Sequence, residues 1–468
     1  MAKHRFPYEW TLKDANFTKD KGKVFSCFAC GGGSTMGYKL AGFDVLGCNE
    51  IDSKMIETYK LNHKPKYAYL EGIQTFKNRK DLPKELYNLD ILDGSPPCSS
   101  FSMAGNRDKD WGKKKKFKEG QAEQVLDTLF FDFIDLAKEL QPKVVVAENV
   151  KGLLQGNAIE YVKEIYKQFD EAGYYCQHWL LDASSMGVPQ RRERVFFICL
   201  RKDLAKPFLI QKDMFTQVPK LVLNFNEKPI TFGEIKDGLG KELNAHRFNI
   251  WKNRNILDND YADTNLRVLG KSSQFNYYYA KKDKILPTIT STVLTDFDFP
   301  NILSDKTIIK ACTFPIDYNF NNNKKQYITG MSVPPVMIAQ ISTEIHEQWL
   351  KFLQDQRKDL PKSDEKYWDN ANELGLYDER HKGGYKFGYF YKAVLNRVCK
   401  AIDTSSRFSV SDYKKLFLDI EFILIGSFPL DYNFNKNRVQ YIIGMSVPPV
   451  MIANIVTEIY EQWLNKIK

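Results

Sequence analysis

Long apolar runs and paired cysteines are what the 468-residue sequence lacks most clearly. No stretch approaches the roughly 18 apolar residues that a membrane-spanning helix needs. The polar, charged segment 1–23 has neither the pattern of a signal peptide nor that of an anchor. Eight cysteines in so long a chain do not indicate a disulfide framework. These absences predict a cytoplasmic protein with no membrane partner and reduced thiols.

A metal site and a dinucleotide fingerprint are missing as well. Cys27 and Cys30 form one CxxC pair, but no second pair or nearby histidine completes a zinc site, so no metal is expected. The glycine-rich turn that includes Cys30 does not have GxGxxG spacing. This absence argues against a nicotinamide-dependent dehydrogenase.

Positive charge, in contrast, is in excess. Lys and Arg number 68 against 58 Asp and Glu, a formal net charge of +10. Residues 107–118 alone hold six Lys and one Arg. Such a balance suits a polyanionic partner, although scattered surface lysines would produce the net charge equally well.

Strand and helix patterns alternate through the first 200 residues. Short apolar runs bounded by glycine, proline or polar residues are typical of buried strands, and apolar residues at helical spacing indicate the helices between them. Strands are expected at 24–28, 45–51, 89–92, 144–147, around Trp179 and at 195–200, and helices at 122–140 and 158–169. This order predicts an α/β domain at 1–200 with a doubly wound, largely parallel sheet.

The second half of the chain is organised differently. Residues 201–300 are rich in Asn, Lys and Tyr and predict a smaller, more polar module. Segments 314–350 and 428–464 match at 29 of 37 positions, which indicates duplication of one segment rather than a solenoid. Only the first copy follows a lead-in segment, at 286–290. We therefore expect 301–350 to return to the first domain and 351–468 to be an extension, a cap or an oligomer contact.

A cysteine follows the expected 89–92 strand in the segment Gly94-Ser95-Pro96-Pro97-Cys98. Loops at the carboxyl ends of parallel strands are where open α/β sheets place their sites. Two prolines restrict the approach to Cys98, and a thiol presented in this way is a candidate nucleophile. A stiff turn with a buried thiol explains the segment equally well.

Charged residues lie at the borders of two further strands. Glu148 and Asn149 close the 144–147 strand, where a glutamate must be paired or protonated, and a protonated one could donate to a substrate. A cap for a helix after Gly152 is the alternative role. Arg192 and Arg194 precede the 195–200 strand and share one face, which suits phosphate or carbonyl oxygens as well as a solvated edge.

Glycines follow the first expected strand in Phe28-Ala29-Cys30-Gly31-Gly32-Gly33. Glycines permit a tight turn and a close approach of ligand to backbone. Glu50 lies 20 residues after Cys30, and an acid at about that distance can bind ribose hydroxyls. A ligand that contains a nucleotide is indicated.

Taken together and in this order, these segments resemble the bacterial and phage DNA cytosine-5 methyltransferases over about residues 10–350. Pro-Pro-Cys, Glu-Asn-Val and Gln-Arg-Arg-Glu-Arg are similar to three signatures of that family, and Phe-Pro-Ile-Asp-Tyr and Gly-Met-Ser-Val-Pro-Pro to its last two. The resemblance implies a Rossmann-like methyltransferase domain that uses S-adenosylmethionine, with 201–300 as target-recognition domain. It also implies double-stranded DNA as substrate and a cognate restriction endonuclease as a functional partner.

The resemblance also implies roles for single residues. Cys98 would attack C6 of a flipped cytosine, Glu148 would act at N3, Asn149 would hold the Pro-Pro-Cys loop, Arg194 would contact O2, and Arg192 would brace that loop or a phosphate. The basic loop after Cys98 would be a lid. The expected cofactor residues are Phe28, Ala29, Cys30, Gly31, Gly32, Gly33, Glu50, Ile51, Ile73, Gly94, Ser95, Pro96 and Ser332.

The sequence departs from the family pattern at two places. Met331 and Met445 replace the usual Asn of the last motif, which leaves Ser332 or Ser446 for that contact, and Gly72 stands where an acid is common. Two other functions stay open. A tRNA cytosine-5 methyltransferase would keep the same catalytic residues, and the duplication could have left a catalytically inactive DNA-binding protein.

Overall fold

The computed structural model describes residues 4–97, 114–115, 124–125, 128–155, 158–211, 216–272, 277–290, 294–358, 390–393, 407–410, 415–416, 452 and 455. The chain divides into two compact units, Met1–Leu353 and Gln354–Lys468, and each is described by itself. Within the described residues, no helix has both the length and the apolar character to cross a membrane.

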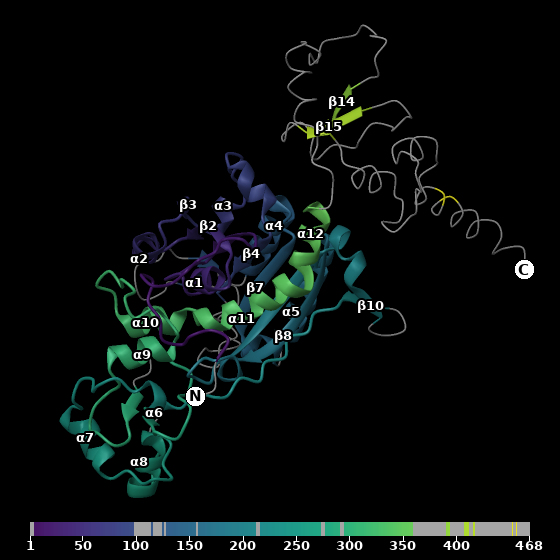
Figure 1. Ribbon diagram of the computed structural model, residues 1–468. Coiled ribbons are helices and arrows are strands. Elements are labelled where there is room, and N and C mark those ends of the chain that lie inside the picture. The colour runs from purple at the N-terminus through teal and green to yellow at the C-terminus, as the bar shows by residue number, and fades with distance from the viewer. Residues whose placement is uncertain are drawn as a thin grey trace, which may run out of the picture. The chain divides into compact units, whose positions relative to one another are not determined.

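A seven-stranded sheet forms the centre of the first unit, in the order β3-β2-β1-β4-β7-β9-β8 (Figure 1). Of the seven strands, β9 alone runs in the opposite direction to the rest. The strand order reverses between β1 and β4, the switch point at which open α/β sheets bind ligands. The predicted doubly wound, largely parallel sheet is confirmed. The strands are β1 (Lys23–Cys27), β2 (Asp44–Glu50), β3 (Tyr67–Leu70), β4 (Ile91–Gly94), β7 (Val144–Val150), β8 (Tyr174–Asp182) and β9 (Glu193–Arg201).

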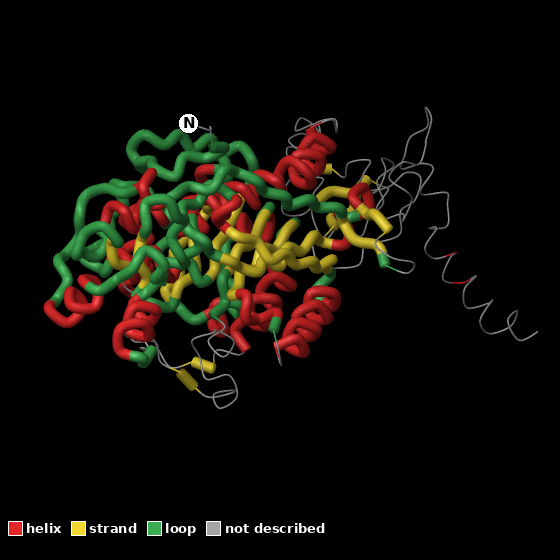
Figure 2. Tube along the Cα trace, turned by 90° about the horizontal axis from the view of Figure 1, so that it is seen from below, coloured by secondary structure: helices red, strands yellow, loops and turns green. Residues whose placement is uncertain are grey.

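Helices cover both faces of the sheet, as the red helices above and below the yellow strands show in Figure 2. On one face α3 (Ile73–Phe76), α4 (Leu129–Leu140) and α5 (Ala158–Glu171) share a hydrophobic core with the strands. On the other face α1 (Gly33–Leu40) and α11 (Pro335–Ile345) do so. The central strand β7 begins with four fully buried residues, Val144 to Ala147, because both of its faces are covered.

The prediction of a helix from residue 122 was wrong at its start. α4 begins at Leu129, whereas Gln124 and Val125 form β6 and pair with Lys114–Lys115 of β5. Helical spacing of apolar residues continues across the boundary, but the backbone groups of 124–125 bond to another strand instead. The pattern therefore located the helix and not its first turn.

The first copy of the duplicated segment packs against α1 because α1 carries glycines on that side. A Cβ added at Gly37 would lie 2.4 Å from the Pro335 carbonyl oxygen and 2.5 Å from Cβ of Ile338. A Cβ at Gly33 would lie 2.4 Å from the Val333 carbonyl oxygen. The chain then continues through a π-helical turn (His346–Leu350) into α12 (Lys351–Lys358). The segment 314–350 thus covers the second face of the sheet.

The polar module between β9 and the first copy forms a separate lobe with short elements (Figure 1). Within it β12 (Tyr278–Ala280) and β13 (Leu294–Asp296) pair in parallel, and its helices are α6 (Phe232–Ile235), α7 (Ala245–Lys252) and α8 (Tyr261–Leu269). The antiparallel pair β10 (Leu209–Gln211) and β11 (Gln217–Pro219) precedes the lobe in the chain and lies apart from it, with Leu209 packed against the core of the sheet domain (Figure 1). α9 (Asp305–Ala311) and α10 (Lys325–Met331) follow the lobe, and α2 (Ser53–His63) lies between β2 and β3.

The second unit contributes three described strands, β14 (Phe390–Ala393), β15 (Arg407–Val410) and β16 (Lys415–Leu416). β14 and β15 are parallel, and β16 is antiparallel to β15. Apart from Ile452 and Ile455, the second copy at 428–464 lies outside the described residues. The expected boundary of the extension at residue 351 stays a prediction.

Candidate active site

Four strand ends meet at one edge of the sheet and bring the polar segments together. Cys27 at the end of β1 pairs with Gly94 of β4, and Gly94 pairs with Ala147 of β7. Because β9 is antiparallel, its second residue, Arg194, pairs with Val150 at the end of β7. Segments 28–33, 94–97, 148–150 and 190–194 therefore lie side by side near the switch point. Cys98, the expected nucleophile, lies outside the described residues, which on this loop end at Pro97.

Glu148 is nine-tenths buried and forms an ion pair with Arg194. The distance from Nε of Arg194 to Oε1 of Glu148 is 2.9 Å, and both side chains are largely shielded from solvent. A partner of opposite charge is what allows a carboxylate to be buried at a strand end. Glu148 does not cap the 3-10 helix Lys151–Leu154, which has Val150 at its N-cap and no side-chain cap hydrogen bond.

Asn149 connects β7 to the proline loop. Its Nδ2 donates to the carbonyl oxygen of Pro96 at 3.2 Å, and its Oδ1 accepts from the backbone N–H of Val150 at 2.9 Å. The side chain is buried. The amide thus holds the residue two positions before Cys98 in place.

Arg192 braces backbone and does not face outward to a phosphate. Its Nη1 donates to the carbonyl oxygen of Ile289 at 3.2 Å and its Nη2 to that of Gly330 at 3.0 Å. Burial, with Arg194 nearby, lowers the pKa of Arg192, but a guanidinium remains protonated at neutral pH. These contacts differ from both expected ones, since they go neither to a phosphate position nor to the described residues 94–97 of the Pro-Pro-Cys loop. Arg192 ties β9 to the segments that precede and include the first copy.

Gln190 was missed by sequence reasoning although it belongs to the same motif. Its Nε2 donates to the carbonyl oxygen of Ala311 at 2.8 Å, and its Oε1 accepts from the backbone N–H of Ile289 at 3.1 Å. The side chain is fully buried. Only the position of residues about 100 and 120 further along the chain reveals this role, so no local signal could have indicated it.

The glycine turn after β1 is bound to Glu50 through backbone. Phe28, Cys30 and Gly32 have positive φ values of 53°, 47° and 79°, which produces a tight turn. Glu50 accepts from the N–H of Cys30 at 2.7 Å and from those of Ile51 and Asp52 at 2.9 Å. Burial raises the pKa of Glu50, and these three donors act in the opposite direction. A carboxylate can accept about four bonds, so one direction is left for a ligand hydroxyl.

The remaining expected cofactor residues surround this turn. The Phe28 ring lies 6.3 Å from the ring of Phe133 between centroids, and a Cβ on Gly94 would come within 2.6 Å of the same Phe133 ring. Ile73 is buried where α3 begins. Ser332 is buried against Gly33, and its hydroxyl lies beside the Cys30 thiol. An apolar wall, an acid and a buried hydroxyl fit a nucleoside-containing ligand.

Cys30 is not the reactive thiol of this site. Burial raises the pKa of its thiol to about 12, and the neighbouring Glu50 adds to the effect. At neutral pH the thiol therefore stays protonated, and only a thiolate is an effective nucleophile.

Asp93 is a second residue that sequence reasoning passed over. It lies in β4 directly before Gly94, is 1% exposed, and accepts from Ser26 Oγ at 2.7 Å and from Tyr38 OH at 3.1 Å. Burial raises the pKa of Asp93 to about 7, and Glu148 contributes in the same direction. The sequence signal for Asp93 was an acidic residue at the end of an apolar run, a pattern that also simply marks where a buried strand ends.

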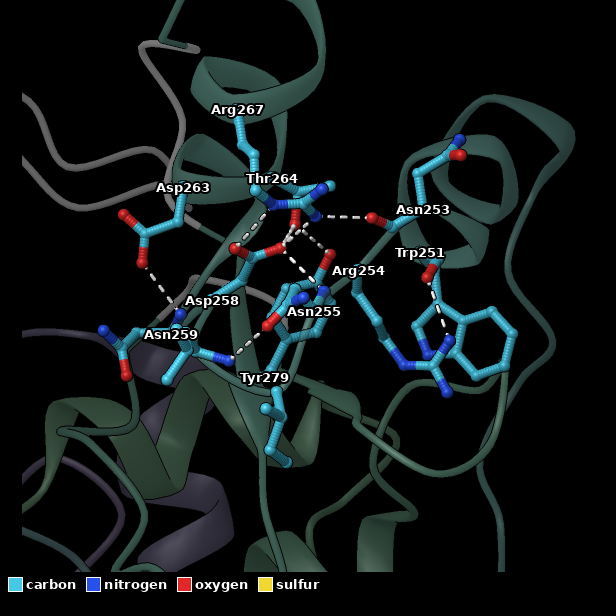
Figure 3. A network of polar contacts seen from close by, with 12 residues as sticks. Trp251, Asn253, Arg254, Asn255, Asp258, Asn259, Asp263, Thr264, Arg267 and Tyr279 are labelled. Carbon is cyan, nitrogen blue, oxygen red and sulfur yellow. Dashed lines mark hydrogen bonds and ion pairs between the residues drawn. The ribbon is translucent and has the colours of Figure 1, made fainter.

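The separate lobe has its own buried ionic centre, shown in Figure 3. Asp258 is 5% exposed and accepts from Arg267 Nη2 at 2.7 Å, from Thr264 Oγ1 at 2.9 Å and from the backbone N–H of Asn255 at 2.8 Å. The hydrogen bond from Arg267 lowers the pKa of Asp258. The loop that this centre holds presents Leu257, which is 82% exposed.

The sequence model of the C-5 cytosine-specific DNA methylase family matches residues 22–347. The chain belongs to this family. Among curated members, the type II methyltransferase M.FnuDI of Fusobacterium nucleatum is 40% identical over 182 residues, which are 39% of this chain and 48% of that protein. The type II methyltransferase M.NgoPII of Neisseria gonorrhoeae is 36% identical over 190 residues, 41% of this chain and 51% of that protein.

The chain thus spans about half the length of these curated C-5 methylase relatives. Among solved structures, one described as a DNA modification methyltransferase encoded within an E. coli prophage has a TM-score of 0.51 and 19% identity. The match covers 70% of this chain and 99% of that one. This likeness shows a shared fold.

Proposed function

We propose that this member of the C-5 methylase family transfers a methyl group from S-adenosylmethionine to C5 of a cytosine in double-stranded DNA. The observation that carries the proposal is the Glu148–Arg194 pair beside the Asn149–Pro96 contact. Together they place an acid and a cation next to the loop that leads to Cys98. Family membership supports the same reaction.

S-adenosylmethionine, when bound, supplies an electrophilic methyl group on a sulfonium centre. Glu50 has a free acceptor direction for a ribose hydroxyl, and Phe28 offers a ring face for the adenine. Ile51 and Ile73 would line the same pocket. The buried hydroxyl of Ser332, beside Cys30, would lie at the same pocket.

Cys98 would act by covalent catalysis on the base. Its thiolate adds to C6 of cytosine, which places the electron pair of the C5–C6 double bond at C5. C5 then accepts the methyl group, its proton leaves to a base such as water, and the returning electron pair expels the Cys98 thiolate. Since C5 and C6 are shielded within a duplex, the cytosine must first be extruded.

Glu148 and Arg194 would stabilise the adduct. With Arg194 bonded to the cytosine O2, Glu148 is released from its full ion pair and can share a proton with N3. A proton at N3 withdraws electrons from the ring and favours addition at C6. The ion pair seen in the unbound chain therefore holds both groups in position until the base arrives.

DNA recognition would be divided between two parts of the chain. The basic segment 99–118 fits a lid that contacts phosphates, although it falls almost wholly outside the described residues. The lobe built around Asp258 would read base edges in the major groove. The relatives are named type II methyltransferases, which supports a cytoplasmic role beside a cognate restriction endonuclease.

Methylation mapping tests the proposal. The wild type, Cys98→Ala and the control Cys176→Ala are expressed with a reporter plasmid in a host that does not methylate its DNA. We expect 5-methylcytosine in one sequence context with the wild type and the control, and none with Cys98→Ala. Folded wild-type protein with no mark on DNA would contradict the proposal. Transfer of labelled methyl groups to tRNA would then separate the RNA methyltransferase from an inactive DNA-binding protein.

A further inference from the structure

A buried histidine lies beneath the glycine turn and has no part in the reaction proposed above. His63 is the last residue of α2 and is 7% exposed. A Cβ added at Gly32 would lie 2.2 Å from Nε2 of His63 and 2.8 Å from its Cδ2. The imidazole therefore lies directly against the turn, in space that the glycine at position 32 leaves open.

Lys39 determines which ring nitrogen of His63 carries the hydrogen. Its Nζ lies 3.4 Å from Nδ1 of His63 and donates to the His63 carbonyl oxygen at 3.1 Å. Burial lowers the pKa of Lys39 to about 8, so the ammonium form still predominates at neutral pH. An ammonium group has only donors, and Nδ1 must therefore be the acceptor. In a neutral imidazole the hydrogen is then on Nε2.

Two donors from separate elements converge on one peptide group of the turn. Nε2 of His63 faces the Gly31 backbone, and the carbonyl oxygen of Gly31 also accepts from Tyr318 OH. A carbonyl oxygen has two lone pairs and can accept from both groups. Tyr318 belongs to the first copy at 314–350, whereas His63 ends α2.

The surroundings of His63 keep its ring uncharged. The ring centroid lies 4.5 Å from that of Tyr59 and 6.3 Å from that of Tyr318. Burial, followed by the charge of Lys39, lowers the pKa of His63 well below its ordinary value. The Nε2–H group is therefore a permanent donor at neutral pH, because the ring does not titrate there.

The turn itself needs to be held by its neighbours. Phe28 and Cys30 have positive φ values of 53° and 47°, a conformation that is strained for residues with a Cβ and persists only where the surroundings maintain it. Cys30 also donates its N–H to Glu50, the acid proposed to bind the ribose. Gly31 is the next residue, so its position bears directly on both cofactor contacts.

We propose that His63 is a positioning residue for S-adenosylmethionine, which acts through the Gly31 carbonyl oxygen and does not touch the cofactor. Its Nε2–H holds the glycine turn in the shape that places Phe28 and Glu50 around the adenosine. Lys39 acts one step further out, by keeping the hydrogen on Nε2. The inference rests on the proposed function, because it adds a residue to the same cofactor site.

The position of the hydrogen is tested in the full-length chain without any ligand. The six histidines are labelled with nitrogen-15, and the His63 signals are assigned by their loss in His63→Gln. We expect the shifts of a neutral ring with its hydrogen on Nε2, unchanged between pH 7.5 and 5.5. A ring that titrates near the ordinary pKa of 6.5, or that carries its hydrogen on Nδ1, would overturn the proposal, whether or not the chain methylates DNA.

Cofactor affinity is measured by calorimetry with S-adenosylmethionine for the wild type and matched variants. Leucine at position 63 fills the space without a donor, whereas glutamine offers an amide N–H at a similar reach. We expect His63→Leu to bind about tenfold more weakly, the effect of one hydrogen bond, and His63→Gln to recover most of the loss. The control Tyr174→Phe removes a buried hydrogen bond to the Pro142 carbonyl oxygen, 2.8 Å long, and should bind as the wild type does.

The outcomes separate positioning from a merely structural role. In a methylation assay, His63→Leu should raise KM for S-adenosylmethionine and leave kcat within about twofold. The proposal is overturned if His63→Leu binds as tightly as the wild type, if Tyr174→Phe weakens binding equally, or if His63→Gln recovers nothing. Thermal unfolding checks that each variant is folded, and His63→Asn, whose amide is too short to reach Gly31, replaces His63→Leu if that variant does not fold.

The same measurements distinguish this inference from the proposed function. A wild type that binds no S-adenosylmethionine would overturn both. Binding that depends on His63 in a chain that leaves DNA unmethylated would contradict the proposed function alone.

Discussion

At the scale of single residues, the sheet edge that carries the site contains buried charged side chains, and each of them has a different kind of partner. Glu148 has Arg194, Arg192 has backbone carbonyl oxygens, and Asp93 has two hydroxyl groups. Burying a charge is costly unless its partners replace water. Removing one partner should therefore cost far more than the pair itself contributes.

Replacing Arg194 by alanine should leave Glu148 buried and unpaired. We expect the free energy of unfolding to fall by about 3–5 kcal/mol, the usual cost of breaking a buried pair from one side. Chemical denaturation at pH 7.5 measures it. Arg191→Ala, at the exposed neighbouring position, is the control and should change little. Equal stability of the two variants would show that the pair is not buried in solution.

Asp93→Asn should change how stability depends on pH. The carboxyl has a pKa of about 7 in the folded chain against an ordinary value of 3.8, so between these values the folded state binds more protons than the unfolded state. Its contribution to stability is therefore present at pH 4 and is lost as the pH rises toward 7. The amount is on the order of a few kcal/mol.

The pH dependence is measured as unfolding free energy between pH 4.5 and 8 for the wild type, Asp93→Asn and the exposed control Asp283→Asn. As the pH rises, the free energy of unfolding of the wild type should fall relative to that of Asp93→Asn. Parallel curves for all three chains would mean that Asp93 titrates normally.

At the scale of elements, two contacts decide how the molecule is built. α1 and α11 approach closely because Gly33 and Gly37 have no side chain, and the lobe loop before α8 is held by Asp258. The first contact completes the cofactor side of the sheet. The second gives shape to a lobe whose elements are too short to be stable alone.

Gly37→Ala should destabilise the first unit although alanine favours helix. The new Cβ would meet the Pro335 carbonyl oxygen at 2.4 Å, and backbone cannot move aside as a flexible side chain can. Overpacking of this kind costs about 1–3 kcal/mol, more than the roughly 1 kcal/mol that alanine gains over glycine in a helix. Lys54→Ala in α2 is the control.

Asp258→Asn should loosen the lobe and leave the sheet unchanged. Loss of the charge weakens the bonds from Arg267 and Thr264 that hold the loop at 253–258. We expect faster amide hydrogen exchange in this loop and in α8, with exchange in β4 and β7 unaltered. Asp283→Asn, at an exposed position outside this network, is the comparison. A uniform increase across the chain would show instead that the lobe and the sheet unfold together.

At the scale of the whole molecule, the first unit contains every described contact of the site. Met1–Leu353 includes the sheet, the lobe and the first copy, and α12 continues across the boundary between the units. Segment 428–464 of the second unit matches 314–350 of the first at 29 of 37 positions. The molecule is therefore a unit that holds the described contacts of the site, followed by a unit in which one of its segments is repeated.

A chain that ends at residue 353 should fold and methylate DNA as the full chain does. Its core includes Trp349 and the α1–α11 contact, both of which lie within the first unit. Thermal unfolding and plasmid methylation measure the two properties. Failure of the shortened chain to fold would place part of the core in 354–468.

Local patterns were sufficient where the signal itself was local. Apolar runs located β1, β2, β4 and β9 to within two residues, because burial on both faces demands such runs wherever the chain folds. The expected 144–147 strand ended three residues too early, and β3 was not predicted. The ends of these runs also located the polar segments after β1, β4 and β7, because parallel strands place their carboxyl ends at the same edge of the sheet. The start of α4 was misplaced, because helical spacing does not show which backbone groups pair elsewhere.

The sequence by itself therefore determined most of the strands, the polar segments at their ends and the family they belong to. Tertiary structure alone decided that Arg194 faces Glu148, because β9 runs antiparallel and so starts at the edge where β7 ends. It also decided that Arg192 and Gln190 hold distant backbone, and that the first copy fills the α1 groove. These facts depend on strand direction and on contacts between residues more than 90 positions apart, and neither is encoded in any short stretch of chain.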